Sequence, residues 1–338
     1  MRVTITGLGK AVPDRIVPNS ELAERIGKSA EWMEIRTGIK ERRYVSDDES
    51  TSSLGTRAAL DALSVSGIEP EEVSLVVVAT STPDYRIPGT ASIIQDAIGA
   101  RSAGAFDVNA ACSGFVYGLA VAASMVGSGA SGPALVIGAD VLSRHINFED
   151  PLTAPLFGDG AGAVVVEADP EAEAMQFQLG SDGSGLHQVL IPRGGSRLTP
   201  DDANAPLRDK IKMSGREVFR NAVRIMTELG MAFGPDSFDL LVAHQANRRI
   251  LDECAGQLGV DRSKVFMNIE RYGNTSAASI PVALQEAWET GKLQSGYRLL
   301  MLAFGAGYTW AGAALRWKLP SPVSDEEAGA ESLATVPA

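Results

Sequence analysis

Short apolar stretches with the character of buried strands recur along the whole chain, and segments long enough for helices separate most of them. The stretches are 3–9, 74–82, 104–110, 134–140, 161–169, 238–246, 265–271, 297–305 and 311–317. Buried strands that alternate with helices are typical of α/β proteins, in which helices cover the faces of a sheet. The pattern therefore predicts an α/β fold.

The spacing of these stretches also predicts an internal duplication. Ser74 and Leu135 in the first half are 61 positions apart, and Phe238 and Leu299 in the second half are 61 positions apart as well. Between each pair of anchors, a strand leads into a turn of small residues and then into a helix-length segment. We therefore expect two similar halves, with the Gly- and Pro-rich segment 170–210 as the connection between them.

The composition is that of a globular protein. Of the 338 residues, 45% are hydrophobic and 21% are charged, no apolar run is long enough to cross a bilayer, and the two cysteines are too few for a disulfide framework. We therefore expect a cytoplasmic protein that does not bind a membrane. The net charge of -12 argues against nucleic acid as a partner.

The segment 319–338, rich in Pro, Ser, Ala and acidic residues, is predicted to be disordered.

Cys112 is the first candidate for chemistry. It lies in AACSGF, where a strand pattern ends and the helix-like VYGLAVAASMV begins. The backbone amides and the dipole at a helix N-terminus stabilise a thiolate, which is what a nucleophilic cysteine requires. The alternative is a small buried hydrophobic residue, the usual role of a free cysteine, and this segment alone does not separate the two.

Two more polar residues are candidates for the same site. His244 is the only one of the three histidines that directly follows a buried-strand stretch, at the strand end where α/β sheets gather catalytic groups. Asn274 follows a strand and precedes a helix, at a corner that corresponds to that of Cys112 in the other half. Its amide could act as a neutral hydrogen-bond donor, although an Asn after Gly is commonly part of a turn or a helix N-cap.

Other motifs give weaker evidence about function. The GLG at 7–9 lacks the third glycine of a dinucleotide-binding loop and is interpreted as a turn, and no phosphate-binding GxxxxGK[ST] occurs. No Cys/His cluster has the spacing of metal ligands. Neither a metal nor a nucleotide cofactor is therefore expected.

Taken together, five motifs resemble those of the β-ketoacyl-acyl-carrier-protein synthase III family of the thiolase superfamily. They are ACSGF around Cys112, FGDGAGA at 157–163, HQANRRI from His244, GNTSAAS around Asn274 and FGAGYTW at 304–310. The match extends from about residue 1 to residue 318. The resemblance implies a homodimer with a duplicated five-layered αβαβα sandwich, in which a half at 1–170 carries the cysteine and a half at 171–318 carries the His and the Asn.

The resemblance also implies a chemistry. Cys112 would accept an acyl group, and His244 and Asn274 would hydrogen-bond the thioester carbonyl of a malonyl unit while carbon dioxide leaves and an enolate forms. The backbone N–H groups of Cys112 and Ala306 would form the oxyanion hole for the attack on the acyl group. The protein would thus be an acyltransferase that starts fatty acid or polyketide synthesis from acyl-CoA and malonyl-acyl carrier protein, without a cofactor.

Binding residues follow from the same resemblance. Trp32, Arg36 and Asn247 match positions that contact coenzyme A or the phosphopantetheine of the carrier. Ile87 stands at an acyl-pocket position that is often Phe, and Pro151 stands where many members have an Arg that stacks on the adenine. Because of these two departures, the motifs do not predict which acyl chain the protein accepts or how tightly it binds coenzyme A.

A basic surface is predicted from helical periodicity. Lys212, Arg216, Arg220 and Arg224 recur every four residues, so on a helix they would form one stripe. With Arg248 and Arg249, this stripe is a candidate docking site for an acidic acyl carrier protein. The alternative is an ordinary solvated helix face.

Two other functions are compatible with part of the pattern. An acyltransferase that passes the acyl group to an alcohol or an amine would share the fold and Cys112, and Ile87 and Pro151 would suit altered substrates. An inactive partner subunit, which shapes a complex without chemistry, would have no need for the thiol, the imidazole and the carboxamide together.

Overall fold

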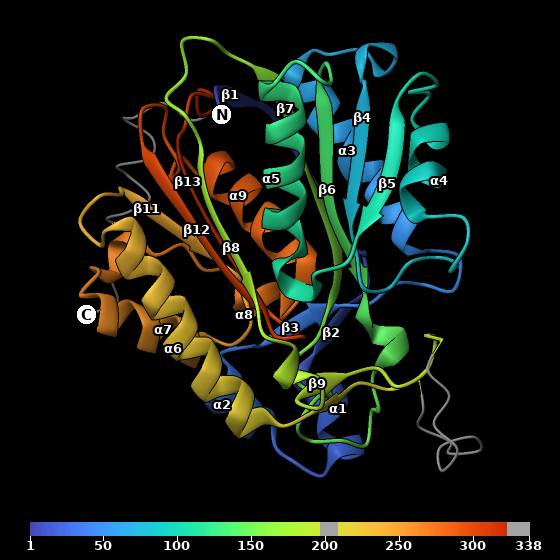
Figure 1. Cartoon of the computed structure of the whole chain (residues 1–338). Helices are drawn as coiled ribbons and strands as arrows, with labels where there is room; N and C mark the ends of the chain where they lie inside the picture. The colour runs from blue at the N-terminus through green and yellow to red at the C-terminus, as the bar shows by residue number, and fades with distance from the viewer. Residues whose placement is uncertain (197–208, 323–338) are drawn as a thin grey trace.

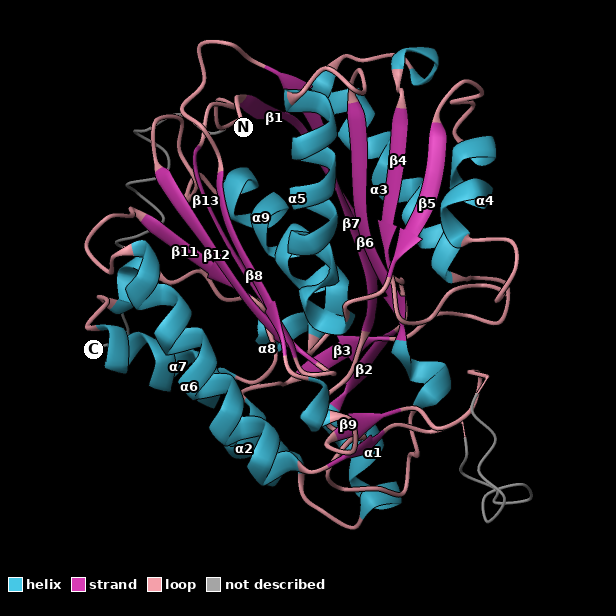
Figure 2. Ribbon diagram, viewed as in Figure 1, coloured by secondary structure: helices cyan, strands magenta, loops and turns pink. Residues whose placement is uncertain are grey.

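The computed structural model describes residues 1–196 and 209–322, which form five alternating layers of helices and sheets (Figures 1 and 2). Two sheets are each covered by helices on both faces, and one layer of helices lies between the sheets. The predicted thiolase-like five-layered sandwich is confirmed. No helix in these two ranges is both long enough and apolar enough to cross a bilayer.

The first sheet has the strand order β1–β7–β6–β4–β5. Its strands are β1 (Val3–Ala11), β4 (Leu75–Ala79), β5 (Gly104–Val108), β6 (Ala134–Val141) and β7 (Asp159–Ala168). The central strand β4 pairs in parallel with β5 and β6, whereas β7 is antiparallel to both of its neighbours. β4 and β6 are buried at every position, as expected of strands that are covered on both faces.

The second sheet repeats this arrangement with the order β11–β12–β13–β8. Its strands are β8 (Gln176–Ser181), β11 (Leu240–Ala243), β12 (Arg298–Gly305) and β13 (Thr309–Arg316). β11 and β12 are parallel and the other pairs are antiparallel, as in the first sheet. Leu75 pairs with Ala134 and Leu240 pairs with Leu299, which is the same separation along the chain in both halves. The predicted duplication is confirmed for four of the strands, and at the place of β5 the second sheet has only an isolated bridge between Leu241 and Val265.

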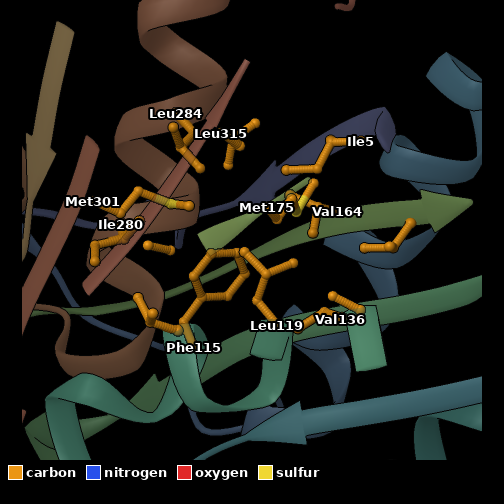
Figure 3. Packing of buried hydrophobic residues seen from close by; sticks show 14 of the residues in the cluster. Ile5, Phe115, Leu119, Val136, Val164, Met175, Ile280, Leu284, Met301 and Leu315 are labelled. Atoms are coloured by element: carbon orange, nitrogen blue, oxygen red, sulfur yellow. The ribbon is translucent and has the colours of Figure 1, made fainter. Parts of the chain in front are cut away.

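Helices fill the remaining three layers. The outer layers are α3 (Thr51–Ser66) with α4 (Thr90–Ala97) on the first sheet, and α6 (Gly215–Phe233) with α7 (Arg248–Leu258) on the second. The central layer is α5 (Gly114–Gly127) with α9 (Ser279–Glu289). Figure 3 shows Phe115 of α5 in the shared core, among side chains such as Val136 of the first sheet and Met301 of the second. One core therefore holds both halves together.

Smaller elements form a cap, which Figure 1 shows below the two sheets. They are β2 (Ile16–Pro18), α1 (Asn19–Ile26), α2 (Ala30–Thr37), β3 (Glu41–Arg43), β9 (Val189–Leu190), β10 (Lys212–Met213) and α8 (Ile269–Tyr272). Their apolar side chains pack in a separate cluster around Met33, Ile39 and Leu156.

Some local predictions are wrong. The stretch 265–271 is not a strand: Val265 makes one isolated bridge to Leu241, and α8 begins at Ile269. β8 was not predicted, because this edge strand exposes polar residues and lies in the segment expected to be a connection. The GLG at 7–9 lies within β1, where a Cβ on Gly9 would be 2.1 Å from the carbonyl oxygen of Ala58, so these glycines let α3 approach the sheet. Residues 319–322 of the predicted disordered tail are packed instead: Leu319 lies against the central core, and Trp288 Nε1 donates to the carbonyl oxygen of Pro320 at 2.6 Å. Residues 323–338 lie outside the described residues.

Candidate active site

Cys112, His244 and Asn274 line one narrow cavity of about 60 Å³. Its other walls are mostly apolar and include Phe157 and Phe304. The three residues come from different strand ends and corners of the two halves, so only the folded duplication brings them together. A thiol, an imidazole and a carboxamide thus share a site from which most water is excluded.

Cys112 lies in a short 3-10 turn, η2 (Ala111–Ser113), directly before α5. Its neighbour Ala111 has φ 48°, a left-handed conformation that is uncommon for a residue with a side chain and typical of constrained functional turns. Thr309 of the second half holds this turn: its hydroxyl donates to the carbonyl oxygen of Ala110 and hydrogen-bonds to Ser113, both at 2.8 Å. The corner that carries Cys112 is therefore fixed by residues of both halves.

The backbone beside the sulfur is closely packed. A Cβ on Gly305 would lie 2.8 Å from the backbone nitrogen of Cys112, so only a glycine lets β12 come this near. The next residue, Ala306, lines the cavity together with Cys112. The two residues proposed from the sequence to form an oxyanion hole are thus neighbours in space.

The protonation state of Cys112 differs from the sequence-based expectation. Burial raises the pKa of the thiol to about 12, a hydrogen bond with Ser276 opposes the rise, and the negative charge of Asp140 adds to it. The cysteine does precede a helix, as predicted, but the loss of solvent outweighs the stabilisation expected for a thiolate there. The free protein therefore holds Cys112 as a neutral thiol.

His244 follows β11 and is 1% exposed. Its Nδ1 lies 2.6 Å from the hydroxyl oxygen of Ser279, which also accepts the backbone N–H of Gln245 at 3.3 Å. We assign the hydroxyl hydrogen of Ser279 to Nδ1, which places the ring hydrogen on Nε2. Burial lowers the pKa of His244 to about 3, so the imidazole stays neutral and can donate from Nε2 into the cavity.

Asn274 follows α8 at the corner that corresponds to that of Cys112. Its side-chain oxygen accepts the backbone N–H of Ser276 at 2.9 Å, and its own backbone N–H donates to the carbonyl oxygen of Leu156 at 2.8 Å. Asn274 therefore takes part in a turn, as the alternative interpretation predicted. This turn leaves only part of the amide free to bind a ligand. With the oxygen already bonded, the NH₂ group is the part of the amide left for a ligand.

A second, larger cavity of about 800 Å³ meets the first at the nucleophile. Cys112, Phe157 and Ala306 line both cavities, so the sulfur lies where they join. Tyr85 and Arg86 line the larger one. The structure does not bring Ile87 to either cavity, since its side chain is 89% exposed.

Trp32, Arg36 and Asn247 lie together where α2 meets the start of α7. The guanidinium of Arg36 lies over the Trp32 ring, 4.5 Å from its centroid, and the Asn247 amide donates to the carbonyl oxygen of Arg36 at 3.2 Å. The Asn247 side chain also caps α7 through the backbone N–H of Arg249 at 2.9 Å. None of the three lines either cavity, but Ala246, next to Asn247, lines the smaller one.

The predicted basic stripe is only partly correct. Lys212 lies on β10, before α6 begins at Gly215, so the helix carries only three of the four basic residues. All of them are exposed. Arg220 pairs with Glu217 and Arg224 with Glu228 on the same helix, and this weakens their charge toward a partner.

The two remaining arginines come from α7. Arg248 pairs with Asp252 at 3.4 Å, and Arg249 lies over the ring of Phe219 of α6, 5.5 Å from its centroid. Among the residues that the structure describes, Arg216 and Arg249 form no ion pair. Lys212 of β10 forms none either within the described residues, so these three residues carry the positive charge of this surface that no carboxylate neutralises.

Three residues around the candidate catalytic groups were not predicted. The hydroxyl of Ser279 faces His244, the backbone N–H of Ser276 donates to the Asn274 side chain, and Asp140 lies near Cys112. Both serines belong to GNTSAAS, but a single sequence does not show which polar group of this motif faces the ring or the amide. Within residues 1–196 and 209–322, no group of three or more His, Cys, Asp or Glu side chains is arranged to hold a metal ion.

Comparison with known proteins agrees with the fold. Two family models match, 3-oxoacyl-[acyl-carrier-protein (ACP)] synthase III at residues 106–183 and its C-terminal domain at 231–317. A β-ketoacyl-[acyl-carrier-protein] synthase III of Clostridioides difficile is 43% identical over 323 residues, 93% of this chain and 98% of its own length. The crystal structure of 3-oxoacyl-[acyl-carrier-protein] synthase III from Aquifex aeolicus superposes with a TM-score of 0.87 at 40% identity, covering 93% of this chain and all of that one.

A priming β-ketosynthase from the R1128 polyketide biosynthetic pathway is also similar, with a TM-score of 0.88, 35% identity and coverage of 95% of this chain and 97% of its own. The duplicated sandwich and the shared Cys-His-Asn cavity define a thiolase-like condensing enzyme. The similar proteins identify one family within this class. The chain belongs to the β-ketoacyl-[acyl-carrier-protein] synthase III family and is an acyltransferase.

Proposed function

We propose that this enzyme takes an acyl group from a thioester onto Cys112 and joins it to a malonyl unit carried by an acyl carrier protein, with loss of carbon dioxide. One observation carries the proposal. His244 and Asn274 are both fixed as neutral hydrogen-bond donors, by Ser279 and Ser276, in the cavity that contains the nucleophile. Neutral donors in a dry cavity suit an oxygen on which negative charge develops.

In the first half-reaction, the sulfur of Cys112 bonds to the acyl carbon and the bond from that carbon to the incoming thiol carrier breaks. The proton lost by Cys112 is balanced by the proton that the departing thiolate takes up. The backbone N–H groups of Cys112 and Ala306 would stabilise the oxyanion of this step. The larger cavity, which meets the smaller one at the sulfur, has room for the acyl chain.

In the second half-reaction, the carboxylate of the malonyl unit leaves as carbon dioxide and its bonding electrons pass to the thioester carbonyl oxygen. Nε2–H of His244 and the NH₂ group of Asn274 would donate to that oxygen as the enolate forms. The enolate carbon then bonds to the acyl carbon on Cys112, and the sulfur leaves as a thiolate that takes up a proton from solvent to restore the thiol. No proton has to move to His244, which agrees with its lowered pKa.

Docking of the carrier would use the residues near the mouth of the smaller cavity. Trp32 and Arg36 would contact the phosphopantetheine or coenzyme A, and Asn247 would shape the entrance through its bonds to α2 and α7. Lys212, Arg216 and Arg249, which have no carboxylate partner among the described residues, would provide most of the attraction for the acidic carrier protein. Arg220, Arg224 and Arg248 are the weaker part of the same proposed surface, since each has a carboxylate partner.

We further propose that the enzyme is a cytoplasmic homodimer. β5 forms the free edge of the first sheet, and Phe106 in the middle of this strand is 37% exposed. An uncovered sheet edge with an exposed aromatic residue favours pairing with a second copy. Sedimentation equilibrium gives the mass in solution, and a monomer at micromolar concentration would contradict this part of the proposal.

The test of the reaction follows one protein sample through both half-reactions. Incubation with an acyl-CoA should add the mass of the acyl group at Cys112, and later addition of malonyl-acyl carrier protein should remove it with release of carbon dioxide. Transfer of the acyl group to an alcohol or an amine without malonyl consumption would instead support the other acyltransferase function. An enzyme that forms no adduct with any of a panel of acyl thioesters would contradict both.

A further inference from the structure

The hydroxyl of Thr309, the first residue of β13, connects the two backbone segments that meet at the sulfur. On the side of Cys112, it lies 2.8 Å from the carbonyl oxygen of Ala110 and 2.8 Å from the hydroxyl of Ser113. On the side of the turn between β12 and β13, it lies 3.2 Å from the carbonyl oxygen of Ala306. One side chain of the second half thus contacts residues on both sides of the cysteine and also the cysteine's neighbour in the cavity.

The directions of these hydrogen bonds follow from the atoms involved. A threonine hydroxyl has one hydrogen and can also accept, whereas a carbonyl oxygen can only accept. The hydrogen of Thr309 is therefore directed at the two carbonyl oxygens, mainly at that of Ala110, which is nearer than that of Ala306. Ser113 then donates to the oxygen of Thr309. Because Ser113 is fully buried, water does not compete for its hydrogen.

The 3-10 turn η2 is strained, and two of its own hydrogen bonds are long. Ala111 has a φ of 48°, which costs free energy in a residue with a side chain and persists only where neighbours hold it. The Ser113 backbone N–H reaches the Ala110 carbonyl oxygen at 3.2 Å, and the Ala111 N–H reaches the Asn109 side chain at 3.3 Å. Both distances are at or beyond the long end for N–H···O bonds, whereas 2.8 Å is usual for O–H···O bonds. The hydroxyl of Thr309 therefore supports a turn that is weakly held by its own contacts.

Gly305 shows how closely the two segments approach each other. A Cβ at this position would lie 2.8 Å from the backbone nitrogen of Cys112 and 3.0 Å from Oγ1 of Thr309. No side chain therefore separates β12 from the turn at this point. The relative position of the backbone N–H groups of Cys112 and Ala306 depends on the contacts between the two segments, and Thr309 forms hydrogen bonds to both segments.

We propose that Thr309 is a positioning residue for the oxyanion hole: its hydroxyl holds the turn of Cys112 against Ala306 and so fixes the two backbone N–H groups of the hole relative to each other. This inference rests on the proposed function, because it assigns to these N–H groups the oxyanion that forms when the acyl carbon is attacked. Donors to an oxyanion act through their preorganised direction, and a misplacement of about 1 Å can lower a rate by about 10²-fold. The threonine acts through the backbone and not on the substrate.

The test compares two reactions of the same sulfur, each followed by intact mass. Acylation of Cys112 by an acyl-CoA forms an oxyanion, whereas alkylation by iodoacetamide is a substitution at a saturated carbon and forms none. Thr309→Val keeps the size of the side chain and removes the hydroxyl. It should lower the rate of acylation at saturating acyl-CoA by about tenfold and leave the rate of alkylation within about twofold. Thr309→Ser keeps the hydroxyl and should restore acylation to within about threefold of the unsubstituted enzyme.

Thr290→Val is the matched control. The hydroxyl of Thr290 donates to the carbonyl oxygen of Glu286 at 2.7 Å, and this residue lines neither of the two cavities. The control should leave both rates within about twofold. If Thr309→Val does not fold, Thr309 and its Val substitution are compared in an Ala111→Gly background, because glycine adopts the left-handed conformation of that position without steric cost.

The outcomes separate this inference from the proposed function. Unchanged acylation in Thr309→Val, or a parallel loss of acylation and alkylation, would overturn the inference, because a merely loosened turn would affect both reactions of the sulfur. Failure of Thr309→Ser to restore acylation would overturn it as well. An unsubstituted enzyme that is alkylated at Cys112 but forms no acyl adduct would contradict the proposed function itself, and this inference with it.

Discussion

The corners that carry Cys112 and Asn274 have similar backbone structures but present different side chains. Each is a 3-10 turn that leads into a central helix, α5 in one half and α9 in the other. In the described residues, the only non-glycine residues with positive φ are Ala111 and Ser276, one at each corner. In the proposed reaction, the thiol at the first corner changes its protonation state, whereas the amide at the second stays a neutral donor. Cys112 follows Ala111 and Asn274 precedes Ser276, so the two side chains come from corresponding corners but from different positions within them.

The most severe test of this division is the loss of the nucleophile. Cys112→Ala should abolish the acyl adduct, because no other described residue in the cavity offers a thiol. Cys254→Ala is the matched control: this cysteine is buried in the α6–α7 layer, where its thiol contacts the carbonyl oxygen of Val223. It should keep acylation within about twofold. An adduct of normal stoichiometry in Cys112→Ala, measured by intact mass, would remove the first corner from the reaction.

The second-largest expected effect is a loss of condensation when the amide at the second corner is removed. Asn274→Ala should lower the rate of condensation by about 10²–10³-fold, the usual cost of one lost donor to a developing oxyanion, and leave acylation of Cys112 within a few fold. Asn268→Ala is a control of the same residue type, since that buried amide donates to Glu286 at 2.9 Å instead of facing the cavity. It should destabilise the protein without separating the two half-reactions. Equal losses of acylation and condensation in Asn274→Ala would contradict the division between the corners.

The two corners should also differ in their response to pH. The thiol of Cys112 has a pKa of about 12, so its ionised fraction rises about tenfold per pH unit between pH 7 and 9, and acylation should rise with it. His244 has a pKa of about 3, so it is neutral at every pH from 5 to 8. Condensation from preformed acyl-enzyme should therefore change little over that range. Stopped-flow measurement of each half-reaction gives the two profiles, and an acidic fall in condensation with a midpoint near pH 6.5 would show that His244 is exposed to solvent and titrates normally.

The same property of His244 predicts a smaller effect on stability. A histidine that stays neutral when folded but ionises near pH 6.5 when unfolded favours the unfolded state as the pH falls below 6.5. The free energy of unfolding should therefore decrease by about 1.4 kcal/mol per pH unit from this group, from pH 6.5 down toward its folded pKa. His244→Gln should have a shallower dependence in urea titrations between pH 6.5 and 5. An identical slope in the variant would mean that another group is responsible.

The sequence predicted the parts of this molecule that depend on local pattern or on long motifs. The buried strands, the duplication and the three residues of the cavity all follow from such signals. The sequence did not predict β8, whose polar edge position lacks a buried pattern, or the helix at 269–272 that replaces an expected strand. It also gave the wrong direction for Cys112, because the position before a helix is visible in the sequence but the loss of solvent around the sulfur depends on contacts between the two halves.

Ser276 and Asp140 illustrate the same limit. They lie 136 positions apart and meet only because the 3-10 turn η7 (Ser276–Ala278) of the second half packs against the end of β6 in the first. A single sequence shows a serine in a motif and an aspartate after a strand, both of which are commonplace. Their proximity comes from the packing of the two halves against each other, where the backbone N–H of Ala277 donates to Asp140, and that is a property of the packed structure.

The weakest effects should come from the surface outside the cavity, where the second half alone provides the basic residues of α6 and α7. Arg249→Glu should raise the KM for malonyl-acyl carrier protein by about five- to tenfold, because this arginine has no carboxylate partner among the described residues and an exposed charge acts mainly on encounter. Arg224→Glu, which removes an arginine already paired with Glu228, should raise it less than threefold. Both effects should shrink at 0.5 M salt, since exposed charges are screened. Equal effects of the two substitutions in steady-state kinetics would mean that the carrier responds to the overall charge of this face and not to the arginine without a carboxylate partner.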